Sequence, residues 1–194
     1  MSVTPTKIKT DSVNFIPKEI ITPNKDSPGI SKTVYSHITS LHHLLSDWST
    51  IREKGLKICK SISALKLYEY KDDYYPHQTK PLTDNLLEAL DSLENVVEGV
   101  GIINNQMQAL AQLQYTHEPV INTWPASEIA ENILNIYNSL RKEFNLKKII
   151  TENIAHCRDE NLIEVYVSSW EFDTYFSMEL SAYLFADVGL AGIT

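Results

Sequence analysis

The sequence has few of the residues that mark several common classes of protein. Its two cysteines, Cys59 and Cys157, form neither a disulfide framework nor a metal-ligand spacing, so we expect reduced thiols in a cytosolic or nuclear protein. The formal net charge of -8 argues against a protein that binds the phosphate backbone of nucleic acids directly. No window approaches the ~18 consecutive apolar residues of a membrane span. Residues 1–10 lack the apolar run of a secretory signal.

The motifs of the familiar enzyme classes are also missing. The chain contains no glycine-rich phosphate loop, no nucleophile elbow and no zinc-protease histidine pair. The adjacent His42 and His43 would point to different sides of a helix, so solvated or capping roles are favoured over a shared metal. Asp72 and Asp73 lie in a tyrosine-rich loop without the preorganisation of a catalytic pair. We therefore expect no enzyme, no cofactor and no metal site.

What the sequence does contain is apolar residues at steps of three and four, which predict an all-α fold. The clearest helix follows Trp124-Pro125, because proline suits a first helical turn. Its apolar face carries Ile129, Ile133, Ile136, Leu140, Phe144, Ile150 and Ile154. Its opposite, polar face is expected to carry Glu128, Glu131, Arg141, Lys142, Lys147 and Lys148. The acidic residues come early and the basic ones late, as the helix dipole favours.

Five helices and no strand are expected in a helical domain over 31–188. Their predicted ranges are about 33–68, 83–115, 126–156, 159–171 and 174–188, with a proline- and tyrosine-rich break at 69–82. Ser31 or Thr33, Thr83 and Asp159 are the expected N-caps. Gly189 is a natural C-terminal stop.

The first two helices carry long apolar stripes that predict an elongated hairpin or coiled coil. The stripes are Ile38, Leu41, Leu45, Trp48, Ile51, Ile58, Ile62 and Leu65, and then Leu86, Leu90, Leu93, Val97, Val100, Met107 and Leu110. Because the stripes run nearly end to end, we expect another helical chain to cover part of them. Gly55 indicates either a close helix crossing or a bend. Asn104 either sets the register between helices or is solvated.

Residues 1–30 are predicted to form a disordered tail, because they hold too few apolar residues to offset the entropy of ordering. Thr4, Thr22 and Ser27 each precede a proline and are candidate sites for a proline-directed kinase. A polar tail also contains such pairs by chance.

The three tryptophans are first interpreted as core anchors. Trp124 lies in a loop at a helix entrance and is the most open to a second role as a partner hot spot. The candidate partner-binding residues are Trp124, Pro125, Tyr166 and Trp170.

Part of the chain resembles a known family. The segments that carry the resemblance are Asn122-Thr123-Trp124-Pro125, Leu140-Arg141-Lys142-Glu143 and Ile154-Ala155-His156, followed by Asp159, Leu162, Tyr166 and Ser169-Trp170. They resemble the C-terminal half of the cyclin-dependent kinase 2-interacting protein family. A weaker likeness covers Leu44, Trp48, Gly55 and Ile62-Ser63-Ala64-Leu65-Lys66, so that the resemblance spans most of 34–188.

The resemblance implies a non-enzymatic nuclear adaptor, with the cytoplasm as a second compartment. The partners it implies are cyclin-dependent kinase, the origin-firing kinase, the checkpoint kinase ATR with ATRIP, and a AAA+ ATPase complex that contains a second small coiled-coil protein. The implied processes are the cell cycle, DNA replication, the DNA damage checkpoint and ribosome maturation. Direct contact with nucleic acid or membrane is not expected. The alternative is a structural coiled-coil subunit of a tethering or kinetochore-type complex.

Overall fold

The computed structural model describes residues 29–69, 75–114 and 118–190. The predicted tail, with Thr4, Thr22 and Ser27, lies outside the described residues except for its last two positions. The helices are α1 (Gly29–Ala64), α2 (Thr79–Leu113), α3 (Ala126–Asn153), α4 (Glu160–Glu171) and α5 (Glu179–Asp187). α1 continues into a π-helical turn, Leu65–Glu69, and two short strands, β1 (Pro119–Ile121) and β2 (Trp124–Pro125), precede α3.

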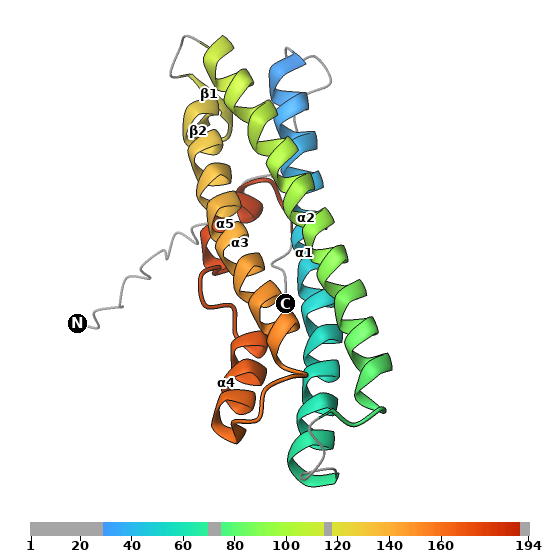
Figure 1. The fold of residues 1–194 in the computed structure, drawn as a ribbon. Helices are drawn as coiled ribbons and strands as arrows, with labels where there is room; N and C mark the ends of the chain where they lie inside the picture. The colour runs from blue at the N-terminus through green and yellow to red at the C-terminus, as the bar shows by residue number, and fades with distance from the viewer. Residues whose placement is uncertain (1–28, 70–74, 115–117, 191–194) are drawn as a thin grey trace, which may run out of the picture.

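The fold is all-α and elongated, as predicted. Three long helices, α1, α2 and α3, run up and down beside one another (Figure 1). α1 packs on α2 and α2 packs on α3, whereas α4 packs on both α1 and α3. α5 packs on α3 farther along the bundle, and its Phe185 ring lies edge-on to His42 of α1, with 5.0 Å between the ring centroids. The described part of the chain is therefore a four-helix bundle whose fourth helix is broken into α4 and α5.

The apolar stripes lie inside this bundle. Fully buried residues of the three long helices include Ile38, Leu45, Trp48, Ile62, Leu86, Leu93, Val100, Met107, Ile129, Ile133, Ile136, Leu140 and Ile150. Most of the stripes are therefore covered within the chain, whereas Ile51, Ile58 and Leu110 are only partly buried, and cover by another chain stays a prediction. α3 packs along α2, and the short α4 and α5 close the side between α1 and α3, so one chain buries its own core.

The start of α2 lies earlier than predicted. α2 begins at Thr79 and includes Pro81, because the backbone N–H groups of a first helical turn need no partner within the helix. Thr83, the expected N-cap, lies inside the helix and donates its hydroxyl proton to the Thr79 carbonyl oxygen over 3.0 Å. Ser31 and Thr33 likewise lie inside α1, where Thr33 donates to the Gly29 carbonyl at 2.8 Å.

Two other predicted helix ends are confirmed. Asp159 caps α4, because its Oδ1 accepts the backbone N–H groups of Asn161 at 2.9 Å and Leu162 at 3.2 Å. Gly189 ends α5 with φ of 74°, and the next N–H, that of Leu190, donates to the Phe185 carbonyl at 2.9 Å. This is the left-handed C-terminal stop that favours glycine.

The prediction that the chain contains no strand is wrong at one place. β1 and β2 pair antiparallel across a tight turn in which Asn122 has a φ of 48°. Asparagine tolerates this left-handed conformation better than most residues. The strands are too short to show a period of two, so the sequence pattern could not reveal them. The hairpin leaves Pro125 extended at the N-cap of α3 rather than inside its first turn.

Candidate functional site

A cluster of buried charges lies where the fourth helix breaks. Lys147, predicted on the exposed face of α3, is fully buried and so is Glu143 one turn before it. Lys147 Nζ lies 2.8 Å from Glu143 Oε1 and 3.4 Å from Asp173 Oδ1. Asp173 follows α4 and pairs with Arg52 of α1 at 2.8 Å. Two acids and two bases from three parts of the chain thus neutralise one another.

The cluster also explains how the fourth helix ends and resumes. Lys147 Nζ donates to the carbonyl oxygens of Ser169 at 2.8 Å and Trp170 at 3.0 Å, which are among the last carbonyls of α4. Glu143 Oε2 accepts the backbone N–H of Tyr175 at 2.7 Å. The side chains of α3 therefore satisfy the backbone groups that the break releases. We interpret the cluster as structural, since every charge in it has an opposite charge beside it.

A second buried lysine acts at the end of α3. Lys66, in the π-helical turn, has a side chain that is nearly inaccessible to solvent. Its Nζ donates to the Ala155 carbonyl at 2.6 Å. A lysine near a helix C-terminus satisfies a free carbonyl and complements the helix dipole. The cation thus ties α1 to the end of α3.

Trp170 is fully buried against α1, and this contact settles the meaning of Gly55. A Cβ atom at Gly55 would overlap the indole ring, so Gly55 marks a close crossing and not a bend. The indole N–H donates to the Arg52 carbonyl at 2.9 Å. Near this crossing, Cys59 is buried, and burial raises the pKa of its thiol to about 12, although the charge of Lys147 opposes the shift.

Trp124 is half-buried and fastens α5 to the hairpin. Its indole N–H donates to the Asp187 carboxylate, and the Asn122 side-chain amide donates to the Asp187 backbone carbonyl. Pro125 is buried beside it. Tyr166 is half-buried on α4. Of the four candidate partner-binding residues, therefore, Trp124 and Tyr166 keep part of their surface and Trp170 and Pro125 do not. Partner binding through any of them stays a prediction.

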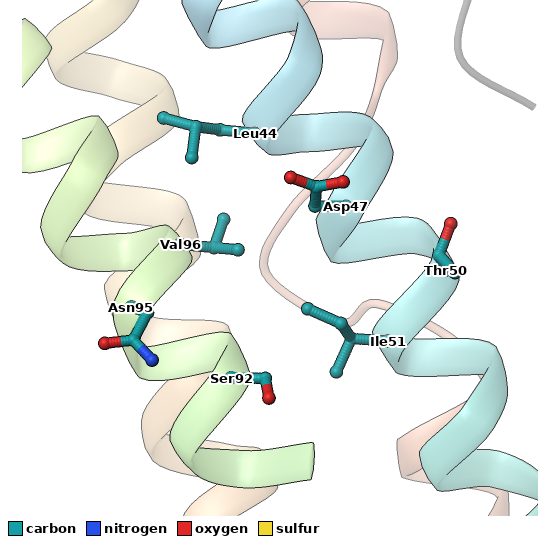
Figure 2. Close-up of a pocket in the computed structure, with 7 residues that line it drawn as sticks. All are labelled: Leu44, Asp47, Thr50, Ile51, Ser92, Asn95 and Val96. Carbon is teal, nitrogen blue, oxygen red and sulfur yellow. The ribbon is translucent and has the colours of Figure 1, made fainter.

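A groove lies between α1 and α2. Its volume is about 340 Å³, and its lining residues are Leu44, Asp47, Thr50, Ile51, Ser92, Asn95 and Val96. Figure 2 shows Leu44, Ile51 and Val96 pointing into the space between the two helices, which gives the groove an apolar floor. Asp47, Thr50 and Asn95 are exposed and form its polar rim. This groove is the candidate interaction site.

Sequence reasoning missed both features, although one left a signal. Glu143 and Lys147 are spaced three and four residues along the stripe from Leu140 to Ile150, and are themselves an i, i+4 pair. Charges at stripe positions indicate a buried pair. The groove had no such signal, because it depends on how α1 and α2 face each other.

Among the described residues, no helix is long and apolar enough to cross a membrane. In the same residues, no group of three or more histidine, cysteine, aspartate or glutamate side chains could hold a metal ion. Fold and groove together define an all-α bundle with a hollowed surface between α1 and α2 that suits a protein segment.

The comparisons with known proteins place the chain more narrowly. No family model matches it. It is 24% identical to the cyclin-dependent kinase 2-interacting protein of Xenopus laevis, over 84% of this chain and 90% of that protein. It is 22% identical to the human protein of that name, over 84% and 91%, and 26% identical to the mouse protein, over 80% and 87%. The resemblance found in the sequence is confirmed: the chain is related to the cyclin-dependent kinase 2-interacting proteins.

Proposed function

We propose that this chain is a non-enzymatic adaptor that binds a cyclin-dependent kinase and connects it to other proteins. The observation that carries the proposal is the relationship to proteins named for interaction with such a kinase, which extends over 84% of the chain. It therefore includes all three long helices of the bundle. The names of these relatives describe an interaction and not a reaction.

The wider setting that we propose is nuclear. The adaptor would serve DNA replication, the DNA damage checkpoint and ribosome maturation. Its further partners would be the origin-firing kinase, the checkpoint kinase ATR with ATRIP, and a AAA+ ATPase complex with a second small coiled-coil protein. These partners rest on the resemblance alone. The net charge of -8 supports a role without direct nucleic-acid contact.

The alternative function, a rod subunit that pairs with other rods, loses its main support. It was the reading in which the long helices only build a rod. Most of the apolar stripe residues are buried within a bundle formed by one chain, so the core does not require a second rod.

The experiment is affinity purification of the full chain from its own cells, with quantitative mass spectrometry. The expected result is enrichment of a cyclin-dependent kinase, together with at least one of the other proposed partners. A purified kinase–cyclin complex should then bind the purified chain directly. Enrichment of coiled-coil rod proteins without any kinase, and no direct binding in the purified system, would refute the proposal.

A further inference from the structure

We propose that the α1–α2 groove binds a basic, amphipathic helical segment of a partner protein. The inference rests on the proposed adaptor function, because it requires a protein partner. It adds where on the chain such a partner binds and what kind of segment it contributes. It is carried by the shape of the groove and by the charges along its rim.

The shape suits anchor side chains of a helix. A volume of about 340 Å³ is at the lower end of the roughly 300–1,000 Å³ typical of ligand pockets. The floor made by Leu44, Ile51 and Val96 is apolar and has no charged group. Two nearly parallel helices that flank an apolar trough can receive a third helix through residues at i, i+3 or i+4 and i+7. The groove therefore fits one or two aliphatic side chains from such a helix.

The charge of the groove rim determines whether a basic or an acidic partner segment is favoured. α2 contains five acidic residues, Asp84, Glu88, Asp91, Glu94 and Glu98, and one basic residue, Lys80, which pairs with Asp84. Glu88 and Asp91 precede the lining residues Ser92 and Asn95 by one turn on the same helix faces. All five acidic residues are exposed.

The α1 side of the groove carries charges of both signs. Asp47 lines the groove directly and is exposed. Lys54, one turn after Thr50, is the basic residue of this rim. Among the described residues, Asp47, Glu88 and Asp91 form no ion pair within the chain, so their charges remain open to a partner. An acidic rim around an apolar floor complements lysine and arginine around aliphatic anchors.

The test is an NMR titration of the ¹⁵N-labelled full chain with a synthetic peptide. The probe is a helix of about 18 residues, roughly 27 Å long, with leucine at i, i+4 and i+7 and lysine at the remaining exposed positions. Shift changes should concentrate on residues 44–54 and 88–98. Affinity should fall between about 0.1 M and about 1 M salt, where the screening length drops from about 10 Å to about 3 Å.

Matched charge reversals separate the groove from general acidity. Asp47→Lys with Asp91→Lys should weaken binding about tenfold or more, because attraction becomes repulsion. Glu131→Lys with Glu164→Lys changes the net charge equally at exposed sites on α3 and α4, and should change affinity less than about twofold. Ser92→Phe should fill the groove and abolish binding while the thermal melting curve stays near that of the parent.

Four outcomes would overturn the inference. They are equal weakening by the two charge-reversed pairs, equal binding of a peptide with glutamate in place of lysine, displacement of the probe by a peptide of residues 1–28, and groove shifts that appear on concentrating the chain alone. The last two would assign the groove to this chain's own segment or to a second copy.

Kinase capture is measured in parallel on the same variants. Capture without peptide binding would refute the groove inference and leave the adaptor function standing. Peptide binding at the groove without kinase capture would refute the adaptor function and leave the groove inference standing.

Discussion

Replacing Lys147 with methionine should destabilise the bundle more than any change of an exposed charge. The variant keeps most of the side-chain volume and removes the cation. Glu143, fully buried, would lose its ion-pair partner at 2.8 Å. Asp173 would keep only the ion pair with Arg52 and the indole N–H of Trp48, which donates to its carboxylate at 3.4 Å.

The size of the effect follows from what remains buried. Breaking a buried pair by removing one partner costs about 3–5 kcal/mol, because the other charge is left uncompensated. The carbonyls of Ser169 and Trp170 would also lose the ammonium donor. For a chain of this length, 1 kcal/mol lowers Tm by roughly 2–4 °C, so we expect a drop of roughly 6–20 °C.

The assay is thermal and urea unfolding followed by circular dichroism. Lys148→Met is the matched control, since Lys148 is the exposed neighbour on the same helix, and it should stay within about 0.5 kcal/mol of the parent. Adding Glu143→Leu to Lys147→Met removes both charges and should recover part of the loss. If Lys147→Met and Lys148→Met unfold together, the cluster does not stabilise the fold and our reasoning is wrong.

Three further predictions concern single contacts. Gly55→Ala should lower stability by about 1–3 kcal/mol in urea unfolding, because its methyl group would overlap Trp170. Burial raises the pKa of the Cys59 thiol from its ordinary value of 9.0 to about 12, so the thiol stays protonated in the fold while that of the unfolded chain ionises. The unfolding free energy should therefore fall as pH rises above 9, by up to about 1.4 kcal/mol per pH unit, and a Cys59→Ala chain should lack this component. Trp124→Phe should loosen α5 by removing the indole donor to Asp187, with faster amide exchange in α5 and little change in α1.

Each of these predictions has its own control. Gly99→Ala is the control for Gly55→Ala. A Cβ atom at Gly99 would lie 3.1 Å from the flexible end of the Leu44 side chain, and alanine has a higher helix propensity than glycine. Equal losses at the two glycines would contradict the close crossing. Parallel pH profiles for the parent and Cys59→Ala would contradict a buried neutral thiol. Unchanged exchange in α5 after Trp124→Phe would show that the indole bond does not hold that helix.

The periodic stripes predicted the long helices well, because each helix buries one face and a buried face leaves a three-to-four spacing. Ile129, Ile133, Ile136 and Leu140 are all fully buried as predicted. Asp159 could be assigned as a cap because the side chain acts on its own following residues. Local chemistry is readable wherever the partner lies within a few positions along the chain.

Where α4 and α5 pack could not be predicted in the same way, although their helices could. Trp170 reaches an Arg52 carbonyl that lies 118 positions away, and Asp173 meets Arg52 across 121 positions. Such contacts depend on tertiary placement, which periodicity does not encode. The burial of Lys147 also depends on tertiary placement. A lysine late in a helix is typical of an exposed position, but here α4 covers the side chain. Residue type predicted exposure, whereas Lys147 is buried beside the opposite charges of Glu143 and Asp173.

Several residues that carry the family resemblance have structural roles in this fold. Trp124 fastens α5 through Asp187, and Trp170 packs on Gly55. A resemblance based on these residues therefore reports the bundle and its broken fourth helix more directly than it reports a partner surface. The groove between α1 and α2 shares Leu44 with the residues that carry the resemblance, and its other lining residues, such as Asp47 and Ser92, are not among them. Loss of partner capture after Trp124→Ala would thus have two physical causes, a lost contact or a detached α5. Trp124→Phe keeps an aromatic surface while removing the bond to Asp187, so comparing the two variants in the capture assay separates these causes.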